Sequence, residues 1–121
     1  MKKNVLIVED NEDNSIIAEK ILKYYGFDTA VSSHGKEALR YCETHLPDLI
    51  LMDLSLPDID GLELTRQLRK IPKFQNVPII ALTAHAMHEI LEASQKAGLD
   101  DFLTKPFLPN DLINLVNKHL H

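Results

Sequence analysis

The sequence predicts an α/β protein with a doubly wound, five-stranded parallel sheet and helices on both of its faces. Short apolar runs alternate five times with longer segments in which apolar residues recur every three or four positions. Such alternation builds βαβ units, whose strands are parallel. Polar residues directly follow the apolar runs, at the edge where open parallel sheets bind their ligands.

The first two strands are expected to flank one helix. Residues 4–8 form the first strand, and the helix begins at a cap, Asp13 or Asn14. Gly26 ends this helix, whose apolar stripe consists of Ile17, Ile21, Tyr24 and Tyr25. Residues 27–31 carry two polar side chains, so they suit a half-exposed strand at an edge of the sheet.

The middle of the chain is expected to contribute two helices around a fully apolar strand at residues 49–53. Ser33 is the predicted cap of the second helix, whose buried stripe consists of Ala38, Leu39, Cys42 and Leu46. The third helix begins near Asp60, which forms a capping-box-like pair with Glu63. This helix buries Leu64, Leu68 and Ile71.

The last two strands are expected at residues 77–83 and 102–104. Pro78 is tolerated because it lies at the start of its strand. The fourth helix ends at Gly98, and its buried residues are Ile90, Ala93 and Ala97. Pro109 suits the first position of the fifth helix, which buries Leu112, Val116 and Leu120.

Length and composition narrow the functional class. The 121 residues suffice for one domain with its own core. The net charge of −5 argues against a general nucleic-acid binder, although a local basic patch is still compatible with it. Cys42 is the only cysteine, and we interpret it as a core residue in a protein of a reducing compartment. No apolar stretch suits a signal peptide or a membrane span, so we expect a soluble, cytoplasmic protein.

Five residues of possible chemical function follow the strands. Glu9 and Asp10 follow the first strand, Asp53 ends the third, Thr83 ends the fourth, and Lys105 comes after the fifth. Each has an ordinary explanation when taken alone, because acids often occupy turns or helix starts and a lysine before a proline is a common loop residue. Parallel strands bring all five to one edge, and this joint placement favours a functional site.

These residue types together suit phosphoryl chemistry. Three crowded carboxylates repel one another unless their pKa values rise or a cation neutralises them. Mg²⁺ prefers such an oxygen-only set and leaves room for phosphate oxygens. Asp53 would be the nucleophile and form an aspartyl phosphate, while Thr83 and Lys105 would contact the phosphoryl oxygens.

Other motifs are weak or missing. Neither common glycine-rich nucleotide loop is present, and the chain has only four glycines. We interpret His85 and His88 as an exposed pair, with a transition-metal site as the alternative. His119 and His121 are expected in a frayed polar end.

Four segments resemble the receiver domains of two-component response regulators. They are VEDN at residues 8–11, LMDLSLP at 51–57 with Gly61, ALTA at 81–84 and LTKPF at 103–107. The resemblance covers essentially the whole chain and implies a flavodoxin-like (βα)₅ fold with strand order 2-1-3-4-5. It also implies one receiver domain over residues 1–121 without an output domain. This domain is either a stand-alone protein, which the Met1 start favours, or a part of a longer protein such as a hybrid histidine kinase.

The resemblance implies a role for each site residue. Asp53 would be the phosphoacceptor, and Mg²⁺ would be bound by Asp10 and Asp53 directly, by Glu9 through water and by the backbone carbonyl of Ser55.

A conformational switch is implied as well. Thr83 and Lys105 would contact the phosphoryl group, which adds about −1.5 to −2 charges. Phe102 occupies the position of the family's switch aromatic and would turn into the space that Thr83 vacates. This movement would reshape the face formed by helix four, strand five and helix five. The bond between Lys105 and Pro106 is expected to be cis.

Three functions follow from these predictions. The favoured one is a phosphoacceptor, not a turnover enzyme, that is fed by a histidine kinase or histidine phosphotransfer protein. It would act on a downstream protein target as a monomer or weak dimer, without direct nucleic-acid binding or membrane insertion. A phosphate-ester hydrolase would need a second acid where Ser55 stands. A pure interaction module is disfavoured because every site position holds a competent residue type.

Overall fold

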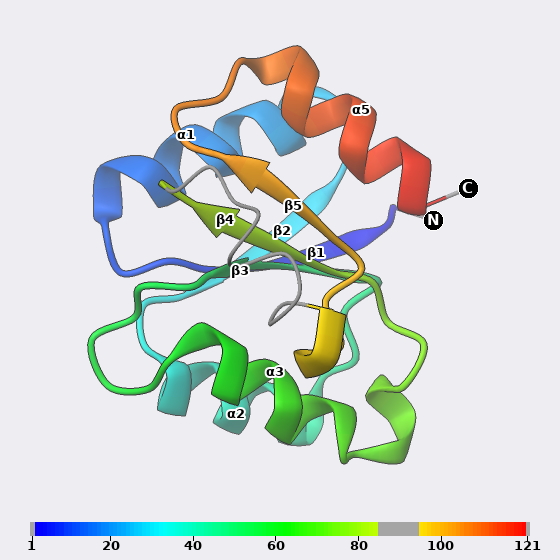
Figure 1. The fold of residues 1–121 in the computed structure, drawn as a ribbon. Coiled ribbons are helices and arrows are strands. Elements are labelled where there is room, and N and C mark those ends of the chain that lie inside the picture. The colour runs from blue at the N-terminus through cyan, green and yellow to red at the C-terminus, as the bar shows by residue number, and fades with distance from the viewer. Residues whose placement is uncertain (1, 85–94, 121) are drawn as a thin grey trace.

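The computed structural model describes residues 2–84 and 95–120. The strands are β1 (Asn4–Val8), β2 (Asp28–Ser32), β3 (Leu49–Asp53), β4 (Ile79–Thr83) and β5 (Asp101–Thr104). They form a parallel sheet in the predicted order β2-β1-β3-β4-β5 (Figure 1). The helices are α1 (Glu12–Tyr24), α2 (Gly35–Thr44), α3 (Gly61–Arg69) and α5 (Pro109–His119), with a short 3₁₀ helix η1 (Pro72–Phe74). Residues 95–97 are also helical.

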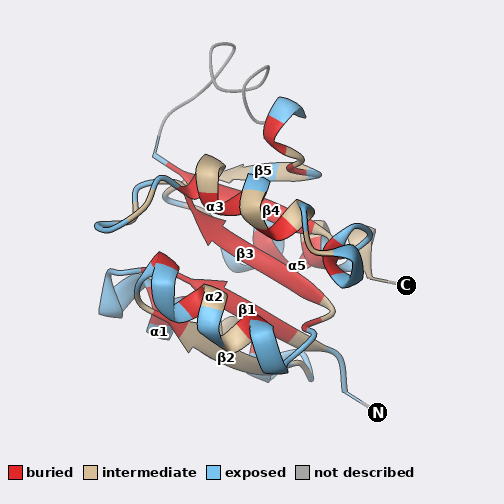
Figure 2. Cartoon of the chain, turned by 90° about the horizontal axis from the view of Figure 1, so that it is seen from below, coloured by how far each residue is buried: buried red, intermediate tan, exposed pale blue. Residues whose placement is uncertain are grey.

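The sheet separates two hydrophobic layers, with α1 and α5 on one face and α2 and α3 on the other (Figure 1). Side chains alternate between the faces along each strand. In β1, Val5 and Ile7 therefore pack into the layer of α1 and α5, whereas Leu6 and Val8 pack into the layer of α2 and α3. The central strands β1, β3 and β4 are buried along most of their length, whereas the edge strands β2 and β5 are more exposed (Figure 2).

The first helix buries a different stripe from the predicted one. Ser15, Ala18 and Leu22 face the core. Of the predicted stripe, Ile21 is partly buried and packs against the core, whereas Ile17 is 52% exposed and Tyr24 is 83% exposed. The helix carries two neighbouring apolar stripes, and periodicity alone does not say which of them packs on the sheet. The predicted stop is confirmed, because Gly26 follows the helix with a φ of 92°.

Two helix starts also differ from the prediction. Asn11, not Asp13 or Asn14, caps α1 by accepting a hydrogen bond from the N–H of Asn14 at 3.0 Å. Ser33 does not cap α2. The carboxylate of Asp58, on the loop between β3 and α3, accepts instead from the first two N–H groups of α2 at 2.8 and 3.0 Å. This contact holds the loop after β3 against the start of α2.

The cap of α3 is confirmed in part. Asp60 accepts a hydrogen bond from the N–H of Leu62 at 2.7 Å. The predicted partner, Glu63, is bound instead by the side chains of Arg66 and Gln67.

Several smaller expectations are also resolved. Cys42 is fully buried in the core, as predicted, and burial raises the pKa of its thiol to about 11. Leu46 lies beyond α2 and is 54% exposed, so it was wrongly assigned to the buried stripe. His119 was wrongly assigned to a frayed end, because its ring lies 3.0 Å from the carboxylate of Asp101.

The expectations for His85, His88, Ile90, Ala93 and His121 fall outside the described residues. Within residues 2–84 and 95–120, no helix has the length and apolar character needed to cross a bilayer.

Candidate functional site

The carboxyl ends of four strands bring the predicted site residues to one edge of the sheet. Asp53 and Thr83 are the last residues of β3 and β4, and Glu9 and Lys105 directly follow β1 and β5. Backbone hydrogen bonds continue past the strand ends. The N–H of Glu9 donates to the carbonyl of Ser32 at 3.0 Å, and the N–H of Lys105 donates to the carbonyl of Thr83 at 2.7 Å. The sheet therefore fixes the backbone from which these side chains start.

The carboxylates of Glu9, Asp10 and Asp53 form a cluster, as predicted. One oxygen of each lies within 4.8 Å of the others. Glu9 and Asp53 are buried, with exposed fractions of 2% and 5%, whereas Asp10 is exposed. Two of the acids are thus withdrawn from water, and the third opens the cluster to solvent.

Lys105 is the cation of this cluster. Its ammonium donates to both oxygens of Glu9, at 2.9 and 3.0 Å, and lies 3.6 Å from Oδ2 of Asp53. Oδ1 of Asp53 accepts a hydrogen bond from the N–H of Ser55 at 2.9 Å. The ammonium therefore pairs with two of the three carboxylates, and the cluster carries an excess of negative charge when all three are ionised.

The environment of Asp53 makes its ionisation unfavourable. Burial, followed by the contact with Glu9, raises the pKa of Asp53, while the N–H of Ser55 and the charge of Lys105 act in the opposite direction. A cation near these oxygens would favour the ionised form. The clustered donors are carboxylate oxygens, which fit a hard divalent ion such as Mg²⁺.

Asn14 belongs to this site, although its sequence position indicated only a helix cap. Its side-chain amide donates to Oε1 of Glu9 at 2.8 Å. The residue lies in the first turn of α1, five positions after Glu9, and no pattern of residue types in that turn reveals where its amide points. Its identification required the structure.

Gly61 permits the close packing behind Asp53. A Cβ atom at this position would lie 2.6 Å from the carbonyl oxygen of Asp53 and 2.7 Å from the Cα atom of Leu54. Side chains do not occupy such distances, so glycine allows α3 to begin directly against the end of β3. Steric crowding against Asp53 and Leu54 thus explains why the motif has a glycine at position 61.

The remaining predicted residues lie around the cluster. Ser55 is exposed on the loop after β3, and Phe102 is 36% exposed on the edge strand β5. The Lys105–Pro106 peptide bond is cis. Of the predicted signalling face, β5 and α5 are described, whereas the prediction of a fourth helix falls mostly on residues 85–94, outside the described part of the chain.

A cavity of about 340 Å³ opens beside the cluster. Its polar side chains are Glu9, Asn14 and Lys105, and its other walls are mainly apolar residues of α1, β4 and the segment after β5. The cavity therefore borders the Glu9 and Lys105 side of the cluster.

Comparisons with known proteins agree with the geometry. The family model described as a response regulator receiver domain matches residues 5–117. The polar-differentiation response regulator DivK of Brucella anthropi is 37% identical over 120 residues, which cover 99% of this chain and 98% of that protein.

Solved structures show the same architecture. The crystal structure of a putative response regulator from Chloroflexus aurantiacus matches with a TM-score of 0.95 at 33% identity. The match covers 99% of this chain and 98% of that one. The receiver domain of a sensor histidine kinase from Pseudomonas aeruginosa, which holds a magnesium ion in its active-site cleft, gives a TM-score of 0.90 at 36% identity and covers 98% and 97%. The chain therefore belongs to the response regulator receiver domain family of two-component signalling.

Proposed function

We propose that Asp53 accepts a phosphoryl group, in a Mg²⁺-dependent reaction, from a phosphohistidine of a histidine kinase or a histidine phosphotransfer protein. One observation carries this proposal: three carboxylates form a cluster, and the ammonium of Lys105 pairs with two of them, Glu9 and, at 3.6 Å from its Oδ2, Asp53. Such an arrangement lacks positive charge until a cation binds, and it then offers both a nucleophile and a group that can bind phosphoryl oxygens.

The nucleophile would be Oδ2 of Asp53. Oδ1 is held by the N–H of Ser55, so Oδ2 faces the ammonium of Lys105 and the incoming group. Oδ2 forms the new bond to phosphorus as the P–N bond of the phosphohistidine breaks, and the electron pair of that bond stays on the departing imidazole.

The other residues would neutralise and orient the transferred group. Mg²⁺, held by Asp10, Asp53 and the carbonyl of Ser55, with Glu9 acting through water, would supply positive charge to the phosphoryl oxygens. Lys105 would exchange its contact with Glu9 for a phosphoryl oxygen, and the hydroxyl of Thr83 would donate to another.

The response would spread along β5. The N–H of Lys105 donates to the carbonyl of Thr83, so the two residues that gain contacts with the phosphoryl group are also joined through their backbones. Phe102 lies three positions before Lys105, and its rearrangement would change the face of helix four, β5 and α5 for a downstream protein. The domain would thus act as a signalling module. We expect it to act in the cytoplasm.

Intact-mass measurement tests the proposal. The purified protein is incubated with acetyl phosphate in the presence of Mg²⁺ or EDTA. We expect the mass of one phosphoryl group on the wild type with Mg²⁺, and none with EDTA or in Asp53→Asn. An unmodified wild type, or equal modification of Asp53→Asn, would contradict the proposal.

A further inference from the structure

The hydrogen bonds to Glu9 come from two directions. Lys105 reaches both carboxylate oxygens from the segment after β5, and the amide of Asn14 reaches Oε1 from α1 at 2.8 Å. Glu9 is only 2% exposed, so its charge depends on protein donors rather than on bulk water.

The contact from Asn14 is not explained by helix capping. The cap of α1 uses the side chain of Asn11 and the backbone N–H of Asn14. The side-chain amide of Asn14 contributes nothing to that cap and could extend into water, because the residue as a whole is exposed. It turns instead toward a buried carboxylate of the site, while the cap fixes the backbone from which it reaches.

We propose that Asn14 is a positioning residue, whose amide holds the Glu9 carboxylate while Lys105 exchanges Glu9 for the phosphoryl group on Asp53. This inference rests on the proposed function. The contact from Asn14 starts on a different element, so it persists when the ammonium of Lys105 moves away. Without it, a buried carboxylate would lose orientation at the moment when its ion pair breaks, and the exchange would be less favourable.

The test compares Asn14→Ala and Asn14→Asp with the wild type. Alanine removes the amide and is a better helix former than asparagine, so α1 is not weakened. Aspartate keeps the size but replaces the donor by a negative charge. Asn117→Ala makes the same chemical change at an exposed position of α5 and serves as the matched control.

Three quantities are measured for each protein: the rate constant of phosphorylation by acetyl phosphate at saturating Mg²⁺, the dissociation constant of Mg²⁺ by calorimetry, and the melting temperature. We expect the rate constant of Asn14→Ala to fall about tenfold, the size expected for one hydrogen bond to a charged group. The rate constant of Asn14→Asp should fall further, because aspartate adds a negative charge next to Glu9. The Mg²⁺ dissociation constant and the melting temperature of Asn14→Ala should stay close to those of the wild type, because Lys105 still donates to both oxygens of Glu9 in the unphosphorylated protein. The amide becomes necessary only when that ion pair breaks.

Each other outcome overturns the inference. A wild-type rate constant in Asn14→Ala, or an equal loss in Asn117→Ala, would show that the amide has no role. A rate loss that follows a lower melting temperature or weaker Mg²⁺ binding would show a general structural role. If the wild type itself takes up no phosphoryl group, the proposed function fails and this inference fails with it, whereas a normal wild type with normal Asn14 variants contradicts this inference alone.

Discussion

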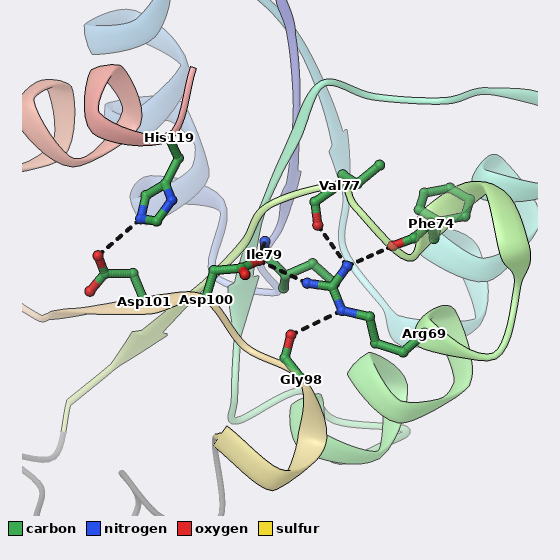
Figure 3. Close-up of polar contacts among 8 residues, drawn as sticks. All are labelled: Arg69, Phe74, Val77, Ile79, Gly98, Asp100, Asp101 and His119. Atoms are coloured by element: carbon green, nitrogen blue, oxygen red, sulfur yellow. Dashed lines mark hydrogen bonds and ion pairs between the residues drawn. The ribbon is translucent and has the colours of Figure 1, made fainter. Parts of the chain in front are cut away.

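The two edges of the sheet each have a partly buried cation, and they differ in what surrounds it. At the amino edge, the guanidinium of Arg69 makes four hydrogen bonds of 2.6–2.9 Å (Figure 3). Its partners are the carbonyl groups of Phe74, Val77 and Gly98 and the carboxylate of Asp100. That carboxylate also accepts a hydrogen bond from the N–H of Ile79. Arg69 and Asp100 thus form a balanced pair that joins α3 to the starts of β4 and β5.

At the carboxyl edge, the ammonium of Lys105 pairs with two carboxylates of a cluster of three. The difference teaches that the same sheet supports two kinds of polar cluster. A cation whose partners match its charge and geometry ties elements together. A cation outnumbered by carboxylates leaves an excess of negative charge that a metal ion can neutralise. Changes at the two edges should therefore affect different properties.

The largest effect is expected from Lys105→Met. This change removes the ammonium that would bind a phosphoryl oxygen, and losing one such preorganised group typically slows a reaction about 10²- to 10³-fold. The rate constant of phosphorylation by acetyl phosphate at saturating Mg²⁺ measures it. Lys20→Met, at an exposed position of α1, is the control and should react like the wild type. A rate for Lys105→Met near that of the wild type would remove Lys105 from the proposed mechanism.

A stability effect is expected from Arg69→Ala. Three carbonyl groups and a carboxylate lose their partner, and we expect the free energy of unfolding to fall by about 2–3 kcal/mol. Arg66→Ala, one turn earlier on α3, removes only a surface pair in which both side chains are 46% exposed, and it should change stability by less than about 0.5 kcal/mol. Urea unfolding measures both. Equal losses in the two variants would show that the Arg69 cluster is not a specific clamp.

The two edges should also respond to pH with opposite signs. Burial of Asp101 acts against its ionisation, but hydrogen bonds from His119, from the N–H of Phe102 and from Lys118 outweigh it and lower the pKa of Asp101. The folded state then binds fewer protons than the unfolded state. Asp101 therefore contributes stability above the ordinary carboxyl pKa, and this contribution is lost as the pH falls. Asp53 has a raised pKa, so its ionisation opposes folding as the pH rises above the ordinary carboxyl value.

Urea unfolding without divalent ions tests this contrast and gives the smallest of the expected effects. At neutral pH, Asp101→Asn should lower the free energy of unfolding and Asp53→Asn should raise it, each by roughly 1 kcal/mol. The Asp53 difference should shrink as the pH falls toward the ordinary carboxyl pKa, whereas the Asp101 difference should persist down to that value and shrink below it. A stabilising Asp101→Asn or a destabilising Asp53→Asn would reverse the assignment of the two edges.

The sequence predicted the features that depend on short-range pattern. The apolar runs that end at Val8, Asp53 and Thr83 predicted three of the strands, and the resemblance to receiver domains implied their central place in the sheet. Because parallel strands bring their carboxyl ends to one edge, the sequence also predicted that Glu9, Asp53 and Lys105 lie together.

The features that were missed depend on contacts between distant segments. The cap of α2 comes from Asp58, more than twenty residues away. The buried stripe of α1 depends on how the helix is rotated against the sheet, which its two apolar stripes leave open. Asn14 was identified only as a possible cap, because no local pattern reveals that its amide reaches Glu9.

The central claim is that the carboxyl edge lacks positive charge and that Mg²⁺ supplies it. The most direct test is the free energy of unfolding of the wild type, Arg69→Ala and Asp53→Asn, each with and without Mg²⁺. At a Mg²⁺ concentration about 100 times its dissociation constant, the wild type should gain about 2.7 kcal/mol. Arg69→Ala should gain the same amount from its lower starting point, and Asp53→Asn should gain much less. No gain in the wild type, or an equal gain in Asp53→Asn, would contradict the account.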